Sequence, residues 1–168
     1  ILKKKNIRRL FTDIIVSTDS NKIKKLSENY KFLSPWIRPK SLSGQFISSE
    51  SSALHALKWY EKNIKKVDAI FLFQPTSPFR SQKKIKTAIK MLTKNPKRQI
   101  VSVCAKETYK FKKNDINGSI YLTPISTLKK FKTFKKKGFM PLKTYRQSEN
   151  IDIDTLEDMV FAEKMINL

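Results

Sequence analysis

The feature that most constrains the fold is the alternation of short apolar runs with longer amphipathic ones. Residues 69–73 are apolar at every position, which is typical of a central strand covered on both faces, whereas residues 49–64 carry apolar side chains at helical spacing. The other strands are expected at 13–17, 100–104, 119–122 and 151–153. Two of the other helices are expected to follow caps, one at Asp19 or Ser20 and one at Ser81, and the last two are expected at 126–136 and 155–166. Strands that alternate with helices predict an α/β layer fold with a mostly parallel sheet.

The length of 168 residues predicts one domain over residues 1–168, and the 39% of hydrophobic residues is enough for a packed core. No run approaches the roughly 18 apolar residues that a membrane helix needs, and the start of the chain is not typical of a secretory signal. We therefore expect no membrane partner and a cytoplasmic location. The single cysteine, Cys104, lies in an apolar run and is expected to be a buried structural thiol.

The net charge of +22 raises the possibility of a polyanion-binding module. Only six of the 36 basic residues are arginine, however, and base readout and bidentate phosphate contacts favour arginine. The lysines are also scattered through every segment. The composition thus favours a solvated basic surface over a specific nucleic-acid partner.

An acidic segment near the carboxyl end stands out from this basic background. Asp152 and Asp154 alternate with two isoleucines, so on a strand both carboxylates would project from one face. A hard divalent cation such as Mg²⁺ relieves the repulsion between two such groups, which predicts a metal site. The alternative is that Asp154 or Thr155 caps the last helix, with a capping box from Thr155 to Asp158, and the two interpretations are compatible.

Ligands of such folds bind beyond the carboxyl ends of the strands, where a polar loop follows residues 69–73. Residues 74–80 offer an amide, two hydroxyls and a guanidinium on a proline-rich loop, which suits an acidic, polyhydroxylated ligand or an ordinary turn. Residues 117–119 are typical of a turn by composition. The sequence contains no recognisable Ser/His/Asp or Cys/His arrangement.

Five motifs in order resemble the acylneuraminate cytidylyltransferases, also called CMP-sialic acid synthetases. They are residues 13–20, Arg38-Pro39, residues 74–80, residues 117–121 and residues 151–158. The resemblance implies a Rossmann-like three-layer sandwich of the nucleotide-diphospho-sugar transferase type. It also implies an Mg²⁺-dependent enzyme that joins CTP to a nine-carbon 2-keto sugar acid and releases pyrophosphate.

The resemblance implies roles for individual residues as well. Asp152 and Asp154 would hold the metal, and one of them would assist deprotonation of the sugar hydroxyl. The side chains expected on the sugar side are Gln74, Ser77, Arg80, Asn117 and Tyr121. Those expected near the nucleotide are Ser17, Asp19 and Arg38.

The chain departs from the family pattern in two places. The Gly/Ser/Lys loop that grips the CTP phosphates is not found at the start, so we expect a chain truncated at its N-terminus. The segment between Val103 and Asn117 is shorter than the pattern, in the region where a dimer arm and a basic sugar-contacting segment are expected, so a homodimer is possible but is not the expected state. A catalytically inactive remnant or sugar-binding relative, and a basic polyanion-binding module, are the alternative functions.

Overall fold

The computed structural model describes residue 2 and residues 4–44 and 46–166. The chain divides into two compact units, residues 1–67 and residues 68–168. The single-domain prediction stays a prediction, because one domain can contain two compact units.

The first unit is mainly helical. Its helices are α1 (Lys5–Arg8), α2 (Asn21–Asn29), the short 3₁₀ helix η1 (Lys40–Leu42) and α3 (Ser49–Asn63). Ser20 caps α2, as predicted, by accepting a hydrogen bond from the Ile23 amide, and Ser48 caps α3 in the same way. α3 buries Ala56, Leu57 and Tyr60, which lie on one face of the helix.

The strand predicted at 13–17 is wrong for this structure. Only Ile15 pairs, in an isolated parallel bridge with Leu33. The Val16 amide donates to the Leu33 carbonyl at 2.8 Å, and the Leu33 amide donates to the Ile14 carbonyl at 2.9 Å. The ladder stops there because Pro35 has no amide hydrogen, and the Ser34 hydroxyl donates to the Val16 carbonyl instead.

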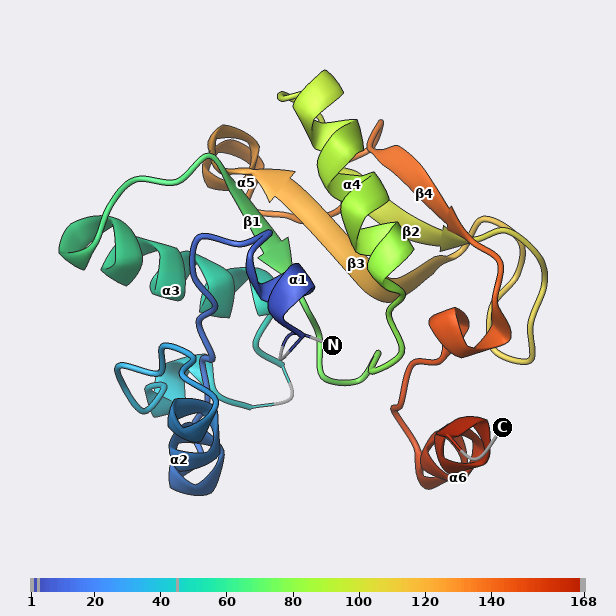
Figure 1. Cartoon of the computed structure of the whole chain (residues 1–168), viewed down its shortest axis with the longest axis horizontal. Coiled ribbons are helices and arrows are strands. Elements are labelled where there is room, and N and C mark those ends of the chain that lie inside the picture. Colours follow the sequence, from blue (N-terminus) through green and yellow to red (C-terminus); the bar gives the residue numbers. More distant parts are fainter. Residues whose placement is uncertain (1, 3, 45, 167–168) are drawn as a thin grey trace. The chain divides into compact units, whose positions relative to one another are not determined.

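The second unit contains a four-stranded sheet (Figure 1). Its strands are β1 (Ala69–Leu72), β2 (Ile100–Cys104), β3 (Ile116–Pro124) and β4 (Met140–Thr144), in the spatial order β1-β3-β2-β4. β3 is antiparallel to both β1 and β2, whereas β4 is parallel to β2. The α/β class is confirmed, but the prediction of a mostly parallel sheet is corrected to a mixed sheet, and β1 is an edge strand rather than a central one.

The direction of β3 follows from its connection. The loop 105–115 between β2 and β3 contains no helix, and antiparallel strands can be joined by such a short connection, whereas parallel neighbours need a longer crossover. β1, β2 and β4 therefore run in the same direction, opposite to β3. The carboxyl ends of these three strands and the first residues of β3 meet at one edge of the sheet, and the candidate site lies at this edge.

Helices complete the second unit. α4 (Gln82–Lys94) is capped by Ser81, as predicted, and packs against β2, β3 and β4 with Ile85 and Ala88 buried (Figure 1). α5 (Ile125–Phe131) ends earlier than the predicted 126–136, at Lys132 in the left-handed conformation with φ of 48°. The 3₁₀ helix η2 (Gln147–Asn150) and α6 (Leu156–Ile166) follow β4.

Residues 151–153, predicted as a strand, do not join the sheet. They follow η2 without regular secondary structure, with Ile151 buried and the Ile153 amide donating to the Thr76 carbonyl at 2.8 Å. β4 takes the sheet position beside β2 instead. In β4, Leu142 and Thr144 are buried and alternate with exposed residues, as in a strand with one face against the core.

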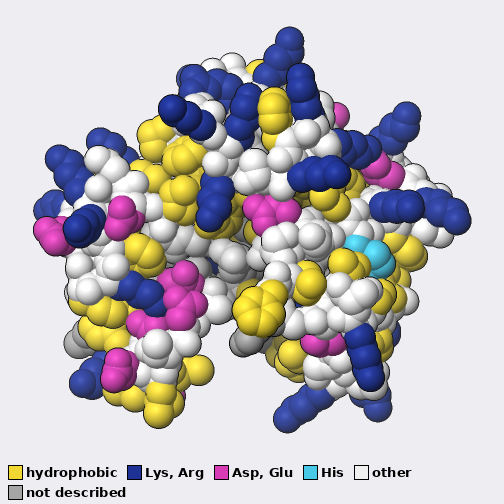
Figure 2. All heavy atoms as spheres, turned by 180° about the vertical axis from the view of Figure 1, so that it is seen from behind, with side chains coloured by type: hydrophobic (Ala, Val, Ile, Leu, Met, Phe, Trp, Pro, Cys, Tyr) yellow, Lys and Arg dark blue, Asp and Glu magenta, His cyan; other side chains and the backbone are white. Residues whose placement is uncertain are grey.

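The basic side chains on the face drawn in Figure 2 do not form a single patch. Figure 2 shows Lys and Arg side chains projecting in many directions over the face drawn, rather than gathering in one patch. No helix in the part of the chain that the structure describes combines the length and the apolar character that a membrane span requires.

Candidate active site

Three predicted sugar-side or metal residues converge on Gly118, near the start of β3. A Cβ added to Gly118 would lie 3.0 Å from Ser77 Oγ, 3.3 Å from Asp152 Oδ2 and 3.3 Å from Gln74 Oε1. The loop after β1 and the segment after β4 thus meet over the backbone of one glycine. Only a residue without a side chain leaves this space open between the three polar groups.

Gly118 occupies an irregular part of β3 rather than the predicted turn. The register between β2 and β3 shifts between Val101, which pairs with Tyr121, and Val103, which pairs with Ile116. Gly118 has a φ of 72°, in the left-handed region that glycine adopts without strain. A bulge of this kind redirects side chains at the edge of a sheet, and here it opens the backbone toward the neighbouring polar loop.

Arg80 braces the loop 74–80. Its Nη2 donates to the Gln74 carbonyl at 2.6 Å, and its Nε donates to the Ser119 carbonyl. The guanidinium also lies 5.1 Å from the centre of the Phe73 ring. Burial lowers the pKa of Arg80 to about 10, and the nearby Asp152 carboxylate partly opposes this shift. The group stays charged at neutral pH and joins the loop to β3.

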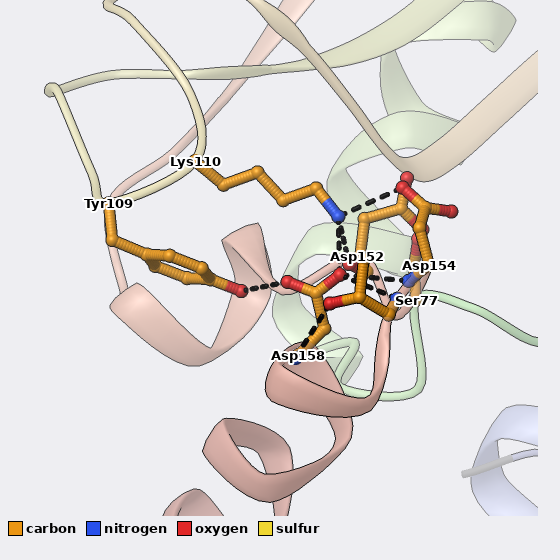
Figure 3. A network of polar contacts seen from close by, with 7 residues as sticks. Ser77, Tyr109, Lys110, Asp152, Asp154 and Asp158 are labelled. Carbon is orange, nitrogen blue, oxygen red and sulfur yellow. Dashed lines mark hydrogen bonds and ion pairs between the residues drawn. The ribbon is translucent and has the colours of Figure 1, made fainter.

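The two aspartates of the predicted metal site have different partners. The Asp152 carboxylate accepts a hydrogen bond from the Ser77 hydroxyl at 3.3 Å. The Asp154 carboxylate is paired with Lys110 at 2.9 Å, and its side chain is 59% exposed. Figure 3 shows these groups, with Lys110 and Tyr109 reaching toward them from the loop between β2 and β3.

Asp158 confirms the predicted capping box. Its Oδ2 accepts a hydrogen bond from the Thr155 amide at 3.0 Å, while the Asp158 amide donates to Thr155 Oγ1 at 3.2 Å. Lys110, the Asp154 amide and Tyr109 also donate to this buried carboxylate. The hydrogen bond from Lys110, followed by those from the backbone, holds the pKa of Asp158 well below its usual range.

Asp152 and Asp154 offer the type of oxygen donor that an Mg²⁺ ion sharing its coordination with a substrate would take. Among the described residues, no group of three or more His, Cys, Asp or Glu side chains is arranged to hold a metal. Mg²⁺ is commonly held by only one or two carboxylates, with waters and substrate phosphates as its other ligands. Asp152 and Asp154 supply such a donor set, whereas the oxygens of Asp158 are occupied by the cap and by Lys110 and Tyr109.

The contacts described for Asn117 and Tyr121 lie in the core of the second unit. Asn117 is fully buried, and its side-chain Nδ2 donates to Thr144 Oγ1 at 2.7 Å and to Asn150 Oδ1 at 2.6 Å. Its side-chain Oδ1 accepts from the Ser102 hydroxyl at 2.6 Å. Tyr121 is also buried, and its ring packs against Phe134 at a centroid distance of 6.0 Å. Asn117 directly precedes Gly118, and its buried hydrogen bonds hold the backbone of β3 next to the cluster.

The network around Asn117 was not predicted from the sequence. Asn150 connects it to the end of β4, because Asn150 Oδ1 also accepts from the Thr144 hydroxyl at 2.6 Å. The Cys104 thiol donates to the same oxygen at 3.0 Å, and its burial confirms the predicted structural role. These buried polar groups satisfy one another across β2, β3, β4 and η2, which stabilises the edge that carries the site.

The predicted nucleotide residues lie together in the first unit. The Arg38 amide donates to the Thr18 carbonyl at 2.8 Å, and the Arg38 guanidinium lies 3.7 Å from the Asp19 carboxylate. The same guanidinium donates to the Ser43 hydroxyl at 3.2 Å. The Ser17 hydroxyl is buried and has no hydrogen-bond partner among the residues that the structure describes.

Comparisons with known proteins identify a relative and a similar fold. The chain is 26% identical, over 93% of its length and 78% of the relative, to the CMP-N,N′-diacetyllegionaminic acid synthase of Legionella pneumophila subsp. pneumophila. Its fold resembles that of the 4-diphosphocytidyl-2C-methyl-D-erythritol synthase from Anaerococcus prevotii, with a TM-score of 0.57, 15% identity and coverage of 95% of this chain and 84% of that one.

The model of the family described as "Cytidylyltransferase" matches residues 2–117, which is more than half of the chain. Together with the Legionella relative, this match confirms the predicted resemblance to CMP-sialic acid synthetases. The chain therefore belongs to the cytidylyltransferase family.

Proposed function

We propose that this cytidylyltransferase joins CTP to a nine-carbon 2-keto sugar acid of the sialic acid type and releases pyrophosphate. The observation that carries the proposal is the convergence of Gln74, Ser77 and Asp152 over Gly118. An amide, a hydroxyl and a carboxylate around an open piece of backbone provide both donors and acceptors for a polyhydroxylated sugar acid. The resemblance to a synthase whose product is a CMP-activated sugar acid supports the same substrate class.

In the proposed reaction, the anomeric hydroxyl oxygen of the sugar forms a bond to the α-phosphorus of CTP. The bond from that phosphorus to the bridging oxygen of the β-phosphate breaks, and pyrophosphate leaves with the electron pair. The proton of the hydroxyl passes to a carboxylate, and Asp152 is the candidate, since its Oδ1 already accepts a hydrogen bond from a hydroxyl. No covalent intermediate with the chain is needed.

The chain's own residues would position the reactants and balance charge. Mg²⁺, when bound by Asp152 and Asp154, would supply the positive charge that the phosphates require. Gln74 and Ser77 would orient the sugar acid. Arg80 would keep the loop that carries them in place, because both of its described hydrogen bonds go to backbone carbonyls.

In the first unit, we propose that Ser17, Asp19 and Arg38 contact the nucleotide. A buried hydroxyl without a partner is uncommon in native structures, and a nucleotide group would satisfy that of Ser17. The Arg38 guanidinium is held only loosely by Asp19, at 3.7 Å, so it is available to pair with an anionic ligand.

The test is release of pyrophosphate and formation of a CMP-sugar from CTP, Mg²⁺ and N-acetylneuraminate. Asp152→Asn and Asp154→Asn should each lower the rate at least about 100-fold, because each removes a charge next to the reacting phosphate. Glu163→Gln is the matched control, since it removes a carboxylate from the exposed part of α6, and it should keep the original rate. Full activity in Asp154→Asn would contradict the proposal.

The same experiment separates the alternatives. Sugar-acid binding without pyrophosphate release would identify a catalytically inactive relative. Salt-sensitive binding of DNA that CTP and sugar do not affect would identify a polyanion-binding module. The scattered lysines of Figure 2 do not favour the latter.

A further inference from the structure

Lys110 lies at the tip of the loop between β2 and β3. The loop is closed at its base, where the Ala105 amide donates to the Thr144 carbonyl and the Asn114 amide donates to the Cys104 carbonyl. Near the tip, the Thr108 amide donates to the Phe111 carbonyl at 2.8 Å, and the Phe111 amide donates to Thr108 Oγ1 at 3.0 Å. This turn directs the side chains of Tyr109 and Lys110 onto the segment 152–158 (Figure 3).

The Lys110 ammonium has all three of its N–H groups matched by acceptors of that segment. Nζ lies 2.6 Å from the Asp152 carbonyl oxygen, 2.9 Å from Asp154 Oδ2 and 2.8 Å from Asp158 Oδ2. An ammonium ion has three donors and no acceptor, so its hydrogen-bonding capacity is used completely.

The three acceptors differ in how firmly they are bound to the rest of the chain. Asp158 is buried, and two backbone amides and Tyr109 also donate to it. The Asp152 carbonyl belongs to the main chain. The Asp154 carboxylate is exposed and has no other hydrogen-bond partner among the described residues, so it is the acceptor that can leave Lys110 at the least cost.

We propose that Lys110 is the internal counter-cation of Asp154, and that a divalent cation binds the chain by taking the Asp154 carboxylate from it. The inference rests on the proposed function, which assigns Asp152 and Asp154 as metal ligands. Lys110 is a positioning residue that acts through Asp154, and it remains anchored by Asp158 and the Asp152 carbonyl when Asp154 turns to the metal. The contact thereby sets the metal affinity of the chain before any substrate binds.

The first test measures Mn²⁺ binding to the metal-free full chain, without CTP or sugar, from the electron paramagnetic resonance signal of free Mn²⁺. Lys110→Met should bind Mn²⁺ about fivefold more tightly, since the competing ion pair and a nearby positive charge are removed. The matched control is Lys113→Met, which removes the same charge from the same loop at an exposed position that has no described contact with the aspartates. It should change the affinity less than about twofold, because exposed charges at a distance are screened.

Asp154 must carry the effect. In an Asp154→Asn background, Lys110→Met should no longer tighten Mn²⁺ binding relative to Lys113→Met. Equal Mn²⁺ affinities of Lys110→Met and Lys113→Met, or weaker binding by Lys110→Met than by the unaltered chain, would overturn the inference. If pyrophosphate release still depends on Asp154 in that case, only the role of Lys110 fails, whereas Asp154-independent release means that the proposed function fails too.

The second test needs no substitution in the measured protein. An ammonium held by three acceptors exchanges its protons slowly with water, so Lys110 should give a side-chain ¹H–¹⁵N signal at low temperature that is missing from Lys110→Arg. Diamagnetic Mg²⁺ should shift or broaden this signal at the concentrations at which the metal binds. A Lys110 signal that saturating Mg²⁺ leaves unchanged would refute the exchange of Asp154 between lysine and metal.

Discussion

Replacing Gly118 with alanine tests whether the open backbone at β3 controls the site. The added Cβ would lie 3.0 Å from Ser77 Oγ and 3.3 Å from Asp152 Oδ2, whereas ordinary van der Waals contact begins at 3.4 Å. Ser77 must therefore move by about 0.4 Å, the difference between 3.4 and 3.0 Å, and Asp152 must move by less. Their mutual hydrogen bond of 3.3 Å is already long, so it is expected to weaken further.

Gly118→Ala should affect both the folding stability and the reaction rate, for separate reasons. Alanine in the left-handed region at a φ of 72° costs about 1 kcal/mol of folding stability relative to glycine. The displacement acts on the reaction, because a misplacement of about 1 Å costs on the order of 100-fold in rate, and a few tenths of an ångström correspond to roughly a tenfold loss. Urea unfolding followed by circular dichroism measures the first effect, and pyrophosphate release measures the second.

Gly138→Ala is the matched control. Gly138 has a φ of 87°, but an added Cβ would meet nothing within 4 Å. It should lose a similar stability of about 1 kcal/mol and keep its activity. If Gly118→Ala releases pyrophosphate as fast as Gly138→Ala, the space above Gly118 does not determine the geometry of the site, and the reasoning is refuted.

Three further predictions concern stability. Burial, together with the hydrogen bond from Tyr60 to Asp13, raises the pKa of Tyr60 to about 12 from about 10 in the unfolded chain. The stabilisation that protonated Tyr60 gives the folded state is therefore fully present below pH 10 and is lost as the pH rises to 12. Chemical denaturation across this range should show a smaller loss of unfolding free energy for Tyr60→Phe than for the unaltered chain. Arg80→Met should lower the unfolding free energy by about 2–4 kcal/mol in urea titrations, because two carbonyls lose a charged donor, and a loss below about 0.5 kcal/mol would contradict the bracing role. Asn150→Ala should lower the unfolding free energy by about 1–3 kcal/mol in the same urea titrations, because Asn117 and Cys104 lose their shared acceptor. The Cys104 thiol should also react faster with a maleimide, since the side chain that packs against it is removed, and an unchanged labelling rate would contradict this.

The features that the sequence predicted well are local ones. Ser20 and Ser81 each cap a helix by accepting a hydrogen bond from the amide three residues later in the chain. Thr155 forms the capping box with Asp158 at the same spacing. Helical periodicity is a property of one continuous segment, so it can be interpreted without knowledge of any partner. The family motifs likewise predicted Gln74, Ser77 and Asp152, which meet in the structure.

Contacts between segments that are far apart in the sequence could not be predicted from local patterns. The run 13–17 has a composition typical of a strand but pairs at a single residue, whereas β4 contains a proline and a lysine and still joins β2. Lys110 is one of many loop lysines, and nothing in its neighbours along the chain indicates that it contacts Asp154 and Asp158. Asn117 matched a family motif, yet its side chain is used entirely within the core.

By itself, the sequence determined which segments form capped helices, which residues are apolar enough to be buried, and which family the chain belongs to. The tertiary structure alone decided the order of the strands in the sheet, the irregular register around Gly118 and the partner of each carboxylate. The physical reason is that helices and caps are stabilised by contacts within a few residues. Strand pairing and ion pairs depend instead on segments up to dozens of residues apart, and only packing of the whole unit selects among the many pairings that local composition allows.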